Sequence, residues 1–322
     1  TATAAANIVM IPLPELKKVT LSDKEAFQKF FATVKEPLAD TTFAMRFIWA
    51  GSLKHTWAII NDNLCVFGYD KGRYVVWGPP VGGTNLAATL AECFEIVEKL
   101  NAAAVNANPA AIYIPEYLKS EYEAVAEKLG CSLDYWTQDY VYRIKDLAEL
   151  KGPGFDSKRN KANFFMKNYD YDVEEFNFDK HGNECLALVD LWRQQKEDTE
   201  DSSADSWRYE IGAETEVART LIKFSRELGV RGIVLKVEGK VVGVSLGEKL
   251  VQNMCSNIIE KTNRAINGAS QFIFREFSSY WSRLSRCEFL NAQDDFGVDY
   301  LKKVKLSYHP VKLLKSYYLE KK

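Results

Sequence analysis

The chain has 322 residues, more than one hydrophobic core usually organises, so two domains are the default expectation. Hydrophobic residues make up 47% and charged residues 27%, as in an ordinary globular protein. A formal net charge of -2 excludes a global attraction to nucleic acid, so any such binding must come from a local basic patch.

The cysteine and histidine pattern argues against a metal site, and the lack of a long apolar run argues against a membrane span. The 6 cysteines are scattered without a Cys-x-x-Cys, which indicates reduced thiols in a cytoplasmic protein. The 3 histidines are isolated, so no zinc site is expected. The opening residues lack the charged start and apolar core of a signal peptide, and no apolar run approaches the ~20 residues of a membrane span. We expect a soluble, cytoplasmic protein without a metal.

The first half of the chain predicts an antiparallel meander followed by alternating helices and strands. The turn formers at 61–63 and 70–72 separate three strand-like runs, and Gly130 ends a helix in which apolar residues recur at helical spacing. The predicted elements are a helix at 22–34, strands at 56–61, 64–69 and 74–77, a helix at 86–100, a strand at 111–114, a helix at 118–129 and a strand at 132–142.

The second half repeats this plan after Lys151-Gly-Pro-Gly154, which breaks regular structure. Its predicted elements are helices at 158–167, 185–196 and 217–228, strands at 232–237, 241–246 and 253–260, a helix at 273–284, a strand at 289–290, a helix at 300–307 and a closing strand at 311–319. This order is that of the acetyltransferase-type (GNAT) fold. We predict an α/β (α+β) protein of two tandem GNAT domains, 1–148 and 149–322, each a mixed sheet flanked by helices.

The most informative segment is Glu288–Gly297, together with the run from Leu301 to Pro310. A short apolar strand delivers Asn291, Asp294 and Asp295 to a turn that ends in glycine. The following helix carries lysines at 302, 303 and 305 on one side. Carboxylates and an amide beside lysines suit a site that handles a polyanionic substrate and moves a proton. The alternative is a loop of turn formers before an ordinary helix whose lysines are solvated.

The order of these residues resembles the Asn-Arg-Glu-x-Asp-x-Gly and Leu-Arg-Lys-x-Lys-x-Ser-Tyr-x-Pro run of the phosphatidylglycerol lysyltransferase C-terminal domain family. Further resemblance lies at Asp139–Tyr142, at Val237–Gly243 with Gly247-Glu248, and at Glu260-Lys261. Two departures are visible. Ala292-Gln293 stands where the family commonly has Arg-Glu, and 257–259 lacks the histidine often found before Glu-Lys. The family includes enzymes that take an amino acid from aminoacyl-tRNA and pass it to a lipid hydroxyl.

The resemblance implies an aminoacyl-tRNA-dependent aminoacyltransferase with a hydroxyl or amine acceptor. Such a donor ester is already activated, so the protein must position the reactants, remove a proton and stabilise an oxyanion. The candidate bases are Asp295 and Glu260, with Asn291 and Lys261 as polarising donors. The alternatives are that Glu260-Lys261 is a surface pair and that Asp294 and Asp295 cap the following helix.

Two basic clusters are candidates for contacts with tRNA phosphates, or else are solvated helix faces. An acyl-coenzyme A-dependent N-acyltransferase and a catalytically inactive binding protein are the competing functions. Arg264 and Gly268-Ala269 lie where an acetyltransferase holds pyrophosphate on backbone amides, but their spacing departs from the usual motif, so coenzyme A is less expected and no cofactor is predicted. The candidate binding residues are Lys158, Arg159, Arg264, Gly268, Ala269, Lys302 and Lys305.

Overall fold

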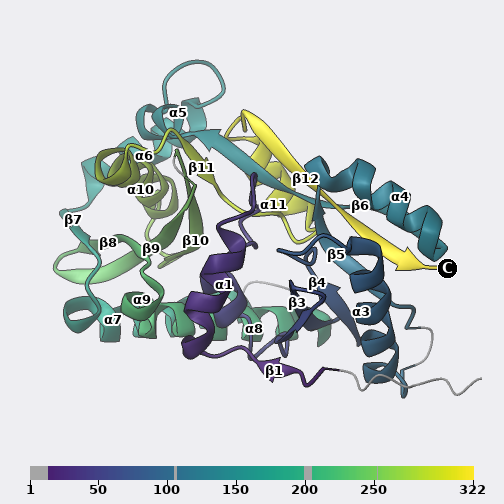
Figure 1. The fold of residues 1–322 in the computed structure, drawn as a ribbon. Helices are drawn as coiled ribbons and strands as arrows, with labels where there is room; N and C mark the ends of the chain where they lie inside the picture. Colours follow the sequence, from purple (N-terminus) through teal and green to yellow (C-terminus); the bar gives the residue numbers. More distant parts are fainter. Residues whose placement is uncertain (1–13, 105–106, 199–204, 252) are drawn as a thin grey trace, which may run out of the picture.

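The computed structural model describes residues 14–104, 107–198, 205–251 and 253–322. These residues form one twelve-stranded mixed sheet flanked by helices (Figure 1). Its strands are β1 (Lys17–Lys18), β2 (Thr56–Ile60), β3 (Asn63–Asp70), β4 (Arg73–Trp77), β5 (Ala110–Pro115), β6 (Cys131–Arg143), β7 (Tyr171–Glu175), β8 (Arg231–Val237), β9 (Lys240–Val251), β10 (Met254–Thr262), β11 (Phe289–Asn291) and β12 (Lys312–Lys321).

Helices cover both faces of this sheet. They are α1 (Lys24–Phe31), α2 (Phe43–Ile48), α3 (Leu86–Leu100), α4 (Lys119–Leu129), α5 (Ile144–Glu149), α6 (Asp156–Asn168), α7 (Phe178–Glu197), α8 (Asp205–Lys223), α9 (Ser225–Leu228), α10 (Ala269–Ser285) and α11 (Asp299–Leu306), with 3-10 turns η1 (Leu21–Asp23) and η2 (Glu116–Leu118). Local chemistry sets several ends. The Thr42 hydroxyl accepts from the Met45 amide at the start of α2, and Gly130, with φ +67°, ends α4.

The sheet repeats the same pairing in its two halves. Its order is β1-β2-β3-β4-β5-β12-β6-β11-β10-β9-β8-β7. The pairs β4–β5 and β10–β11 are parallel, each with one long helix between its strands, and the other pairs are antiparallel. The central pair is β6 with β12, whose register runs from Lys312 opposite Val141 to Lys321 opposite Cys131. The arrangement confirms the predicted mixed sheet flanked by helices.

The two halves exchange their last strands. β12, from the end of the chain, pairs with β5 of the first half, and β6, from the first half, pairs with β11 of the second. A core on one face also joins the halves, because Phe47 of α2 packs edge-on against Phe224 with ring centroids 5.2 Å apart. The division at residue 148 stays a prediction, and it falls within one continuous sheet.

Several short elements differ from the sequence-based expectations. The first predicted helix is shorter, because η1 precedes α1 and α1 ends at Phe31. Helices α2 and α5 and strands β1 and β7 were not predicted, since none of them is longer than six residues. Among the described residues, none of the helices combines the length and the apolar composition that a membrane span requires. The predicted lack of a signal peptide concerns residues 1–13, which lie outside the described ranges.

Candidate functional site

Strand β11 ends in a cluster of buried polar side chains at the centre of the sheet. Asn291 is fully buried, and its Nδ2 donates to Asp139 Oδ2 at 2.8 Å. The amide N–H of Ala39, from the loop before α2, donates to the same Asp139 oxygen at 2.7 Å. Five residues that meet here are called the junction cluster below: Asp139, Asn291, Asp294, Asp295 and Lys305.

Asp295 holds the turn that follows β11. The Tyr140 hydroxyl donates to Oδ2 of Asp295, and the Gly297 amide donates to Oδ1 at 2.9 Å. Gly297 has φ +73°, a conformation that favours glycine. The carboxylate therefore links β6 to the loop that leads into α11. It does not lie inside α11, whose N-cap is Val298.

Asp294 is the carboxyl group of the cluster whose ionisation is most altered. Burial, followed by the nearby Asp139 carboxylate, raises its pKa to about 7, while Lys305 acts in the opposite direction. Burial also lowers the pKa of Lys305, whose ammonium donates to the Ala292 carbonyl. A buried carboxyl group that titrates near neutral pH beside an ammonium can accept a proton and stabilise negative charge.

Residues of the first half of the chain also contact the junction cluster. Tyr113, in β5, has the unusual φ of +57° for a non-glycine residue and places its hydroxyl 3.5 Å from Asp294 Oδ2. Its ring lies beside Trp77, with centroids 5.6 Å apart. Trp77 donates its indole N–H to Asp40, which also pairs with the buried Arg46. Residues of both halves therefore enclose Asp294.

Gln293 fills the gap where β10 and β11 separate. The parallel pairing of these strands ends at Ser256 opposite Asn291. Beyond it, the Gln293 side chain donates to the carbonyls of Asn257 and Ile258, both at 2.7 Å. An amide side chain thus satisfies backbone acceptors that a neighbouring strand would otherwise pair. This position is one of the two at which the sequence departs from the family pattern.

Glu260 belongs to a second polar site, on the side of the sheet covered by α6 and α10. Its Oε1 accepts from Ser270 Oγ at 3.1 Å, and its buried Oε2 has no hydrogen-bond partner among the described residues. Burial raises the pKa of Glu260 to about 8. Burial, followed by the Glu260 charge, also raises the pKa of Tyr308. The contacts of Glu260 and Asp295 share no residue in the described part of the chain.

Lys261 lies on the opposite face of β10 from Glu260, because neighbouring residues of a strand alternate between faces. Its ammonium pairs with Glu214 of α8 and lies 3.7 Å from the centroid of the Trp192 ring. Burial lowers the pKa of Lys261. The structure brings Asn291, Asp295 and Lys305 together, and it places Glu260 and Lys261 in two other environments.

The candidate phosphate-binding residues are dispersed. Lys302 is exposed on α11, whereas Lys158 of α6 is half-buried with its ammonium 5.0 Å from the Tyr308 ring centroid. Arg159 pairs with Asp156 and donates to the Leu150 carbonyl at 2.7 Å. Arg264 donates its backbone amide to Gln195 Oε1 at 2.9 Å.

Helix α6 packs directly on the glycine loop before α10. Gly268 has φ +83°, and a Cβ atom there would lie 2.3 Å from the Lys161 carbonyl oxygen. Ala269 is fully buried at the start of α10. The loop thus serves the close approach of α6 at Gly268, whereas Ser270, in the first turn of α10, is exposed.

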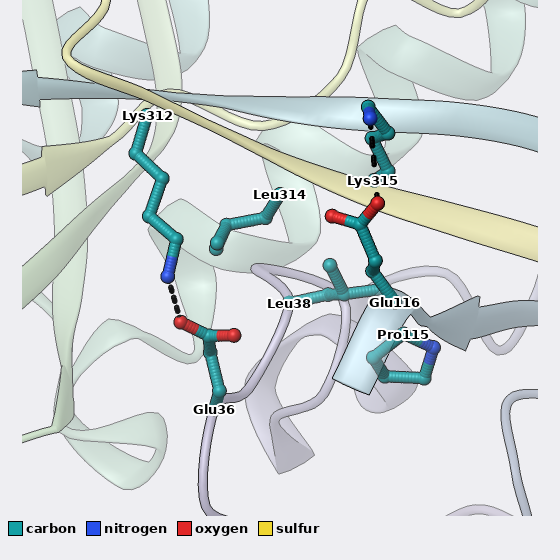
Figure 2. A pocket seen from close by; sticks show the side chains of 7 residues that line it. All are labelled: Glu36, Leu38, Pro115, Glu116, Lys312, Leu314 and Lys315. Carbon is teal, nitrogen blue, oxygen red and sulfur yellow. Dashed lines mark hydrogen bonds and ion pairs between the residues drawn. The ribbon is translucent and has the colours of Figure 1, made fainter. Parts of the chain in front are cut away.

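Two neighbouring cavities open beside the junction cluster. The larger has a volume of about 290 Å³ and includes Val141, which is paired with Asn291, in its lining. The smaller measures about 20 Å³. Figure 2 shows that the ion pairs Glu36–Lys312 and Glu116–Lys315 line the smaller cavity, with Leu314 between them. Leu38 lines the smaller cavity, and the amide of the next residue, Ala39, donates to the Asp139 carboxylate.

Sequence reasoning missed Asp294 as a titrating group, together with Asp139, Tyr113 and Gln293. Asp139 was visible only as part of a family motif, and Tyr113 as an ordinary strand residue. Their effect depends on contacts between residues about 150 to 180 positions apart, such as Asn291 with Asp139 and Tyr113 with Asp294. The signal that could have singled out Asp294 is its place directly after the buried strand β11.

The chain matches a family model described as phosphatidylglycerol lysyltransferase, C-terminal, over residues 31–320. An uncharacterised protein of Mycoplasmoides gallisepticum is 26% identical over 212 residues, which are 65% of this chain and 65% of that relative's length.

Solved structures share the fold. A conserved protein of unknown function from Bacteroides thetaiotaomicron has a TM-score of 0.80 at 26% identity, with 95% of this chain and 99% of that chain covered. The structure of L-PGS from Bacillus licheniformis has a TM-score of 0.64 at 15% identity, with 95% of this chain and 93% of that chain covered. A tandem GNAT protein from the clavulanic acid biosynthesis pathway has a TM-score of 0.50 at 11% identity, with 96% of this chain and 98% of that chain covered. These likenesses confirm the tandem GNAT-like architecture.

Proposed function

The chain belongs to the phosphatidylglycerol lysyltransferase C-terminal family of GNAT-like transferases, and on this premise we propose that it moves an aminoacyl group from aminoacyl-tRNA to a hydroxyl or amine acceptor. The junction cluster is the proposed site of transfer. Proton removal from the acceptor and stabilisation of the oxyanion are the two tasks that its residues must perform.

The observation that carries this proposal is the state of Asp294. A carboxyl group with a pKa of about 7 is divided between its two protonation states at neutral pH, so it can take a proton from the attacking acceptor and release it afterwards. Asp294 also accepts hydrogen bonds, from the Thr137 side chain and the Phe296 amide, but its burial still raises its pKa to about 7, whereas Asp295 links β6 to the turn through Tyr140 and Gly297. We therefore assign the base to Asp294 and a positioning role to Asp295.

Lys305 supplies the positive charge at this site. Its ammonium reaches the backbone at Ala292, next to Asp294, and the buried surroundings strengthen its field. In the proposed reaction it stabilises the negative charge that develops on the ester carbonyl oxygen as the acceptor attacks. Asn291 fixes the geometry by joining Asp139 to the Gln293 amide, from which its Oδ1 accepts a hydrogen bond of 2.8 Å.

The packing at Gly268 supports aminoacyl-tRNA over coenzyme A as the donor. A pyrophosphate group bound there needs free amides at the start of α10. Helix α6 packs against this loop, where the Lys161 carbonyl oxygen occupies the space beside Gly268. The proposed donor does not require this loop.

The test is transfer of a labelled amino acid. The protein is incubated with a mixture of charged tRNAs and a cell extract, and the label is followed into products other than tRNA. Transfer that requires the wild-type protein and is lost in Asp294→Asn supports the proposal. Label that stays on tRNA, or transfer unaffected by Asp294→Asn, contradicts it. Glu127→Gln, on the exposed face of α4, is the matched control.

A further inference from the structure

An exposed apolar segment follows directly after Asp294 and Asp295. The exposed fractions of its side chains are 59% for Phe296, 40% for Val298 and 71% for Tyr300. Phe296 has φ +52°, and the Asp295 carboxylate fixes this turn through the Gly297 amide. The backbone conformation therefore holds Phe296 outward at a position where a bulky residue is uncommon.

The segment is continuous with the junction cluster and with the first half of the chain. The Phe296 ring lies beside the partly buried Trp49, at the end of α2, with centroids 6.4 Å apart. Tyr300 lies in the first turn of α11, the helix that sends Lys305 into the cluster. Phe296 and Tyr300 are called the aromatic platform below.

The charge beside the platform suits an anion. Lys302 and Lys303 follow Tyr300 on α11, and both are exposed. Asp299 is the acidic residue of the same helix. Exposed aromatic rings with flanking lysines are the combination that binds single-stranded nucleic acid, since rings stack on bases while ammonium groups meet phosphates.

We infer that the aromatic platform stacks with unpaired bases at the 3′ end of the donor RNA, while Lys302 and Lys303 contact its phosphates. This inference rests on the proposed function and names the part of the donor that the site would hold. The amino acid of aminoacyl-tRNA is esterified to the terminal ribose. Stacking of the last bases beside residue 296 would therefore bring the ester close to Asp294, two positions earlier in the chain.

The experiment measures affinity for RNA by fluorescence anisotropy. The probes are full-length tRNA, a short single-stranded RNA with the sequence of a tRNA 3′ end, and the same RNA in a blunt duplex. Phe296→Ala and Tyr300→Ala are compared with Tyr117→Ala, which removes a tyrosine that is 40% exposed on η2. Because these side chains are exposed, the variants should fold, and their melting curves check this.

Each platform substitution should weaken binding of the single-stranded probe by roughly 5- to 100-fold, the range that loss of one base–aromatic stack produces. Tyr117→Ala should not weaken it, and the wild-type protein should bind the blunt duplex less well than the single strand. Unchanged affinity in a Phe296→Ala/Tyr300→Ala double variant overturns the inference. A parallel assay measures binding of the same variants to vesicles of anionic lipid. Platform variants that lose vesicle binding but keep their RNA affinity also overturn it and would make this surface a membrane contact.

The same data separate this inference from the proposed function. If tRNA binds and transfer occurs but the platform variants bind the single strand normally, only the platform is wrong. If neither tRNA nor the single strand binds to the wild-type protein, the proposed donor fails and the platform fails with it.

Discussion

Burial of carboxyl groups dominates the chemistry of individual residues. Desolvation raises the pKa of Glu248 and of Asp294 to about 7, and that of Glu260 to about 8. Each group has an ordinary pKa in the unfolded chain. The folded protein therefore binds protons that the unfolded chain has already released, and each group contributes a loss of stability as pH rises.

The sign of this effect can be tested at Glu260. Glutamine is neutral at every pH, so Glu260→Gln should become progressively more stable relative to wild type as pH rises from about 4.5 to about 8, and the difference should then level off. Urea unfolding at several pH values measures this difference. The exposed Glu127→Gln should give a flat difference. A Glu260→Gln difference that is also flat, or that reverses, would show that Glu260 is not desolvated.

The sequence predicted some residues of the candidate site, but it could not predict the role of each. It predicted that Asn291, Asp295, Glu260 and Lys261 would meet in one cleft, but of these four only Asn291 and Asp295 lie together. Lys305, which was expected to bind tRNA, joins them. It could not rank Asp294 above Asp295, because the raised pKa of Asp294 comes from burial and from the Asp139 carboxylate, which belongs to a distant part of the chain. It also could not show that Lys261 pairs with Glu214 on the other face of β10.

At the scale of elements, the separation of β10 from β11 is stabilised by one side chain. Gln293→Ala would leave the Asn257 and Ile258 carbonyls without their donor, at a cost of about 1–3 kcal/mol for a buried unsatisfied group. Urea unfolding should show this loss, and amide exchange should increase in the last residues of β10. Gln271→Ala, on α10, is the control. Equal stability of the two variants would mean that water replaces the Gln293 amide.

Helices α11 and α6 should differ in their contribution to tRNA binding. Lys302 and Lys303 are exposed, whereas Arg159 is already bonded to Asp156 and Leu150. Replacing both α11 lysines with alanine should reduce the slope of log K against log salt by about one for each phosphate that the protein no longer neutralises. Replacing Lys158 and Arg159 should reduce it less. Titrations at several salt concentrations check this, and the reverse order would assign the phosphates to α6.

Element prediction succeeded where periodicity was long and failed where tertiary packing decides. The ranges of α3, α10 and α11 agree with the predicted helices to within a few residues. Helix α2 is too short to show a helical period, and its Thr42 cap has a distant partner, Glu248, which accepts from the Thr42 hydroxyl at 2.6 Å. The φ of +57° at Tyr113, inside a predicted strand, has no sequence signal.

At the scale of the whole molecule, the exchange of β6 and β12 makes the two halves depend on each other. Separated fragments 1–148 and 149–322 would each lack a neighbour for a central strand and half of the shared core. We expect neither to unfold cooperatively alone, and the intact chain to show one calorimetric transition. A fragment 149–322 with a cooperative transition of its own would show that this half is independent.

The repeated element order was readable from the sequence, but the strand exchange was not. Helix and strand periods are local, and they predicted two similar halves. Pairing partners are set by packing between distant segments, so the closing strand could be located at 311–319 without showing that it pairs with β5.

The central claim is that Asp294 of the junction cluster is the proton acceptor in aminoacyl transfer. It is tested most directly by kcat/KM for transfer from charged tRNA in Asp294→Asn and Asp295→Asn, once an acceptor has been identified by the labelling experiment. We predict a loss of roughly 10²–10⁴-fold for Asp294→Asn, the usual size of a general-base contribution. Asp295→Asn should lose much less, because its amide oxygen can still accept from Gly297. Equal losses, or activity retained in Asp294→Asn, would contradict the assignment.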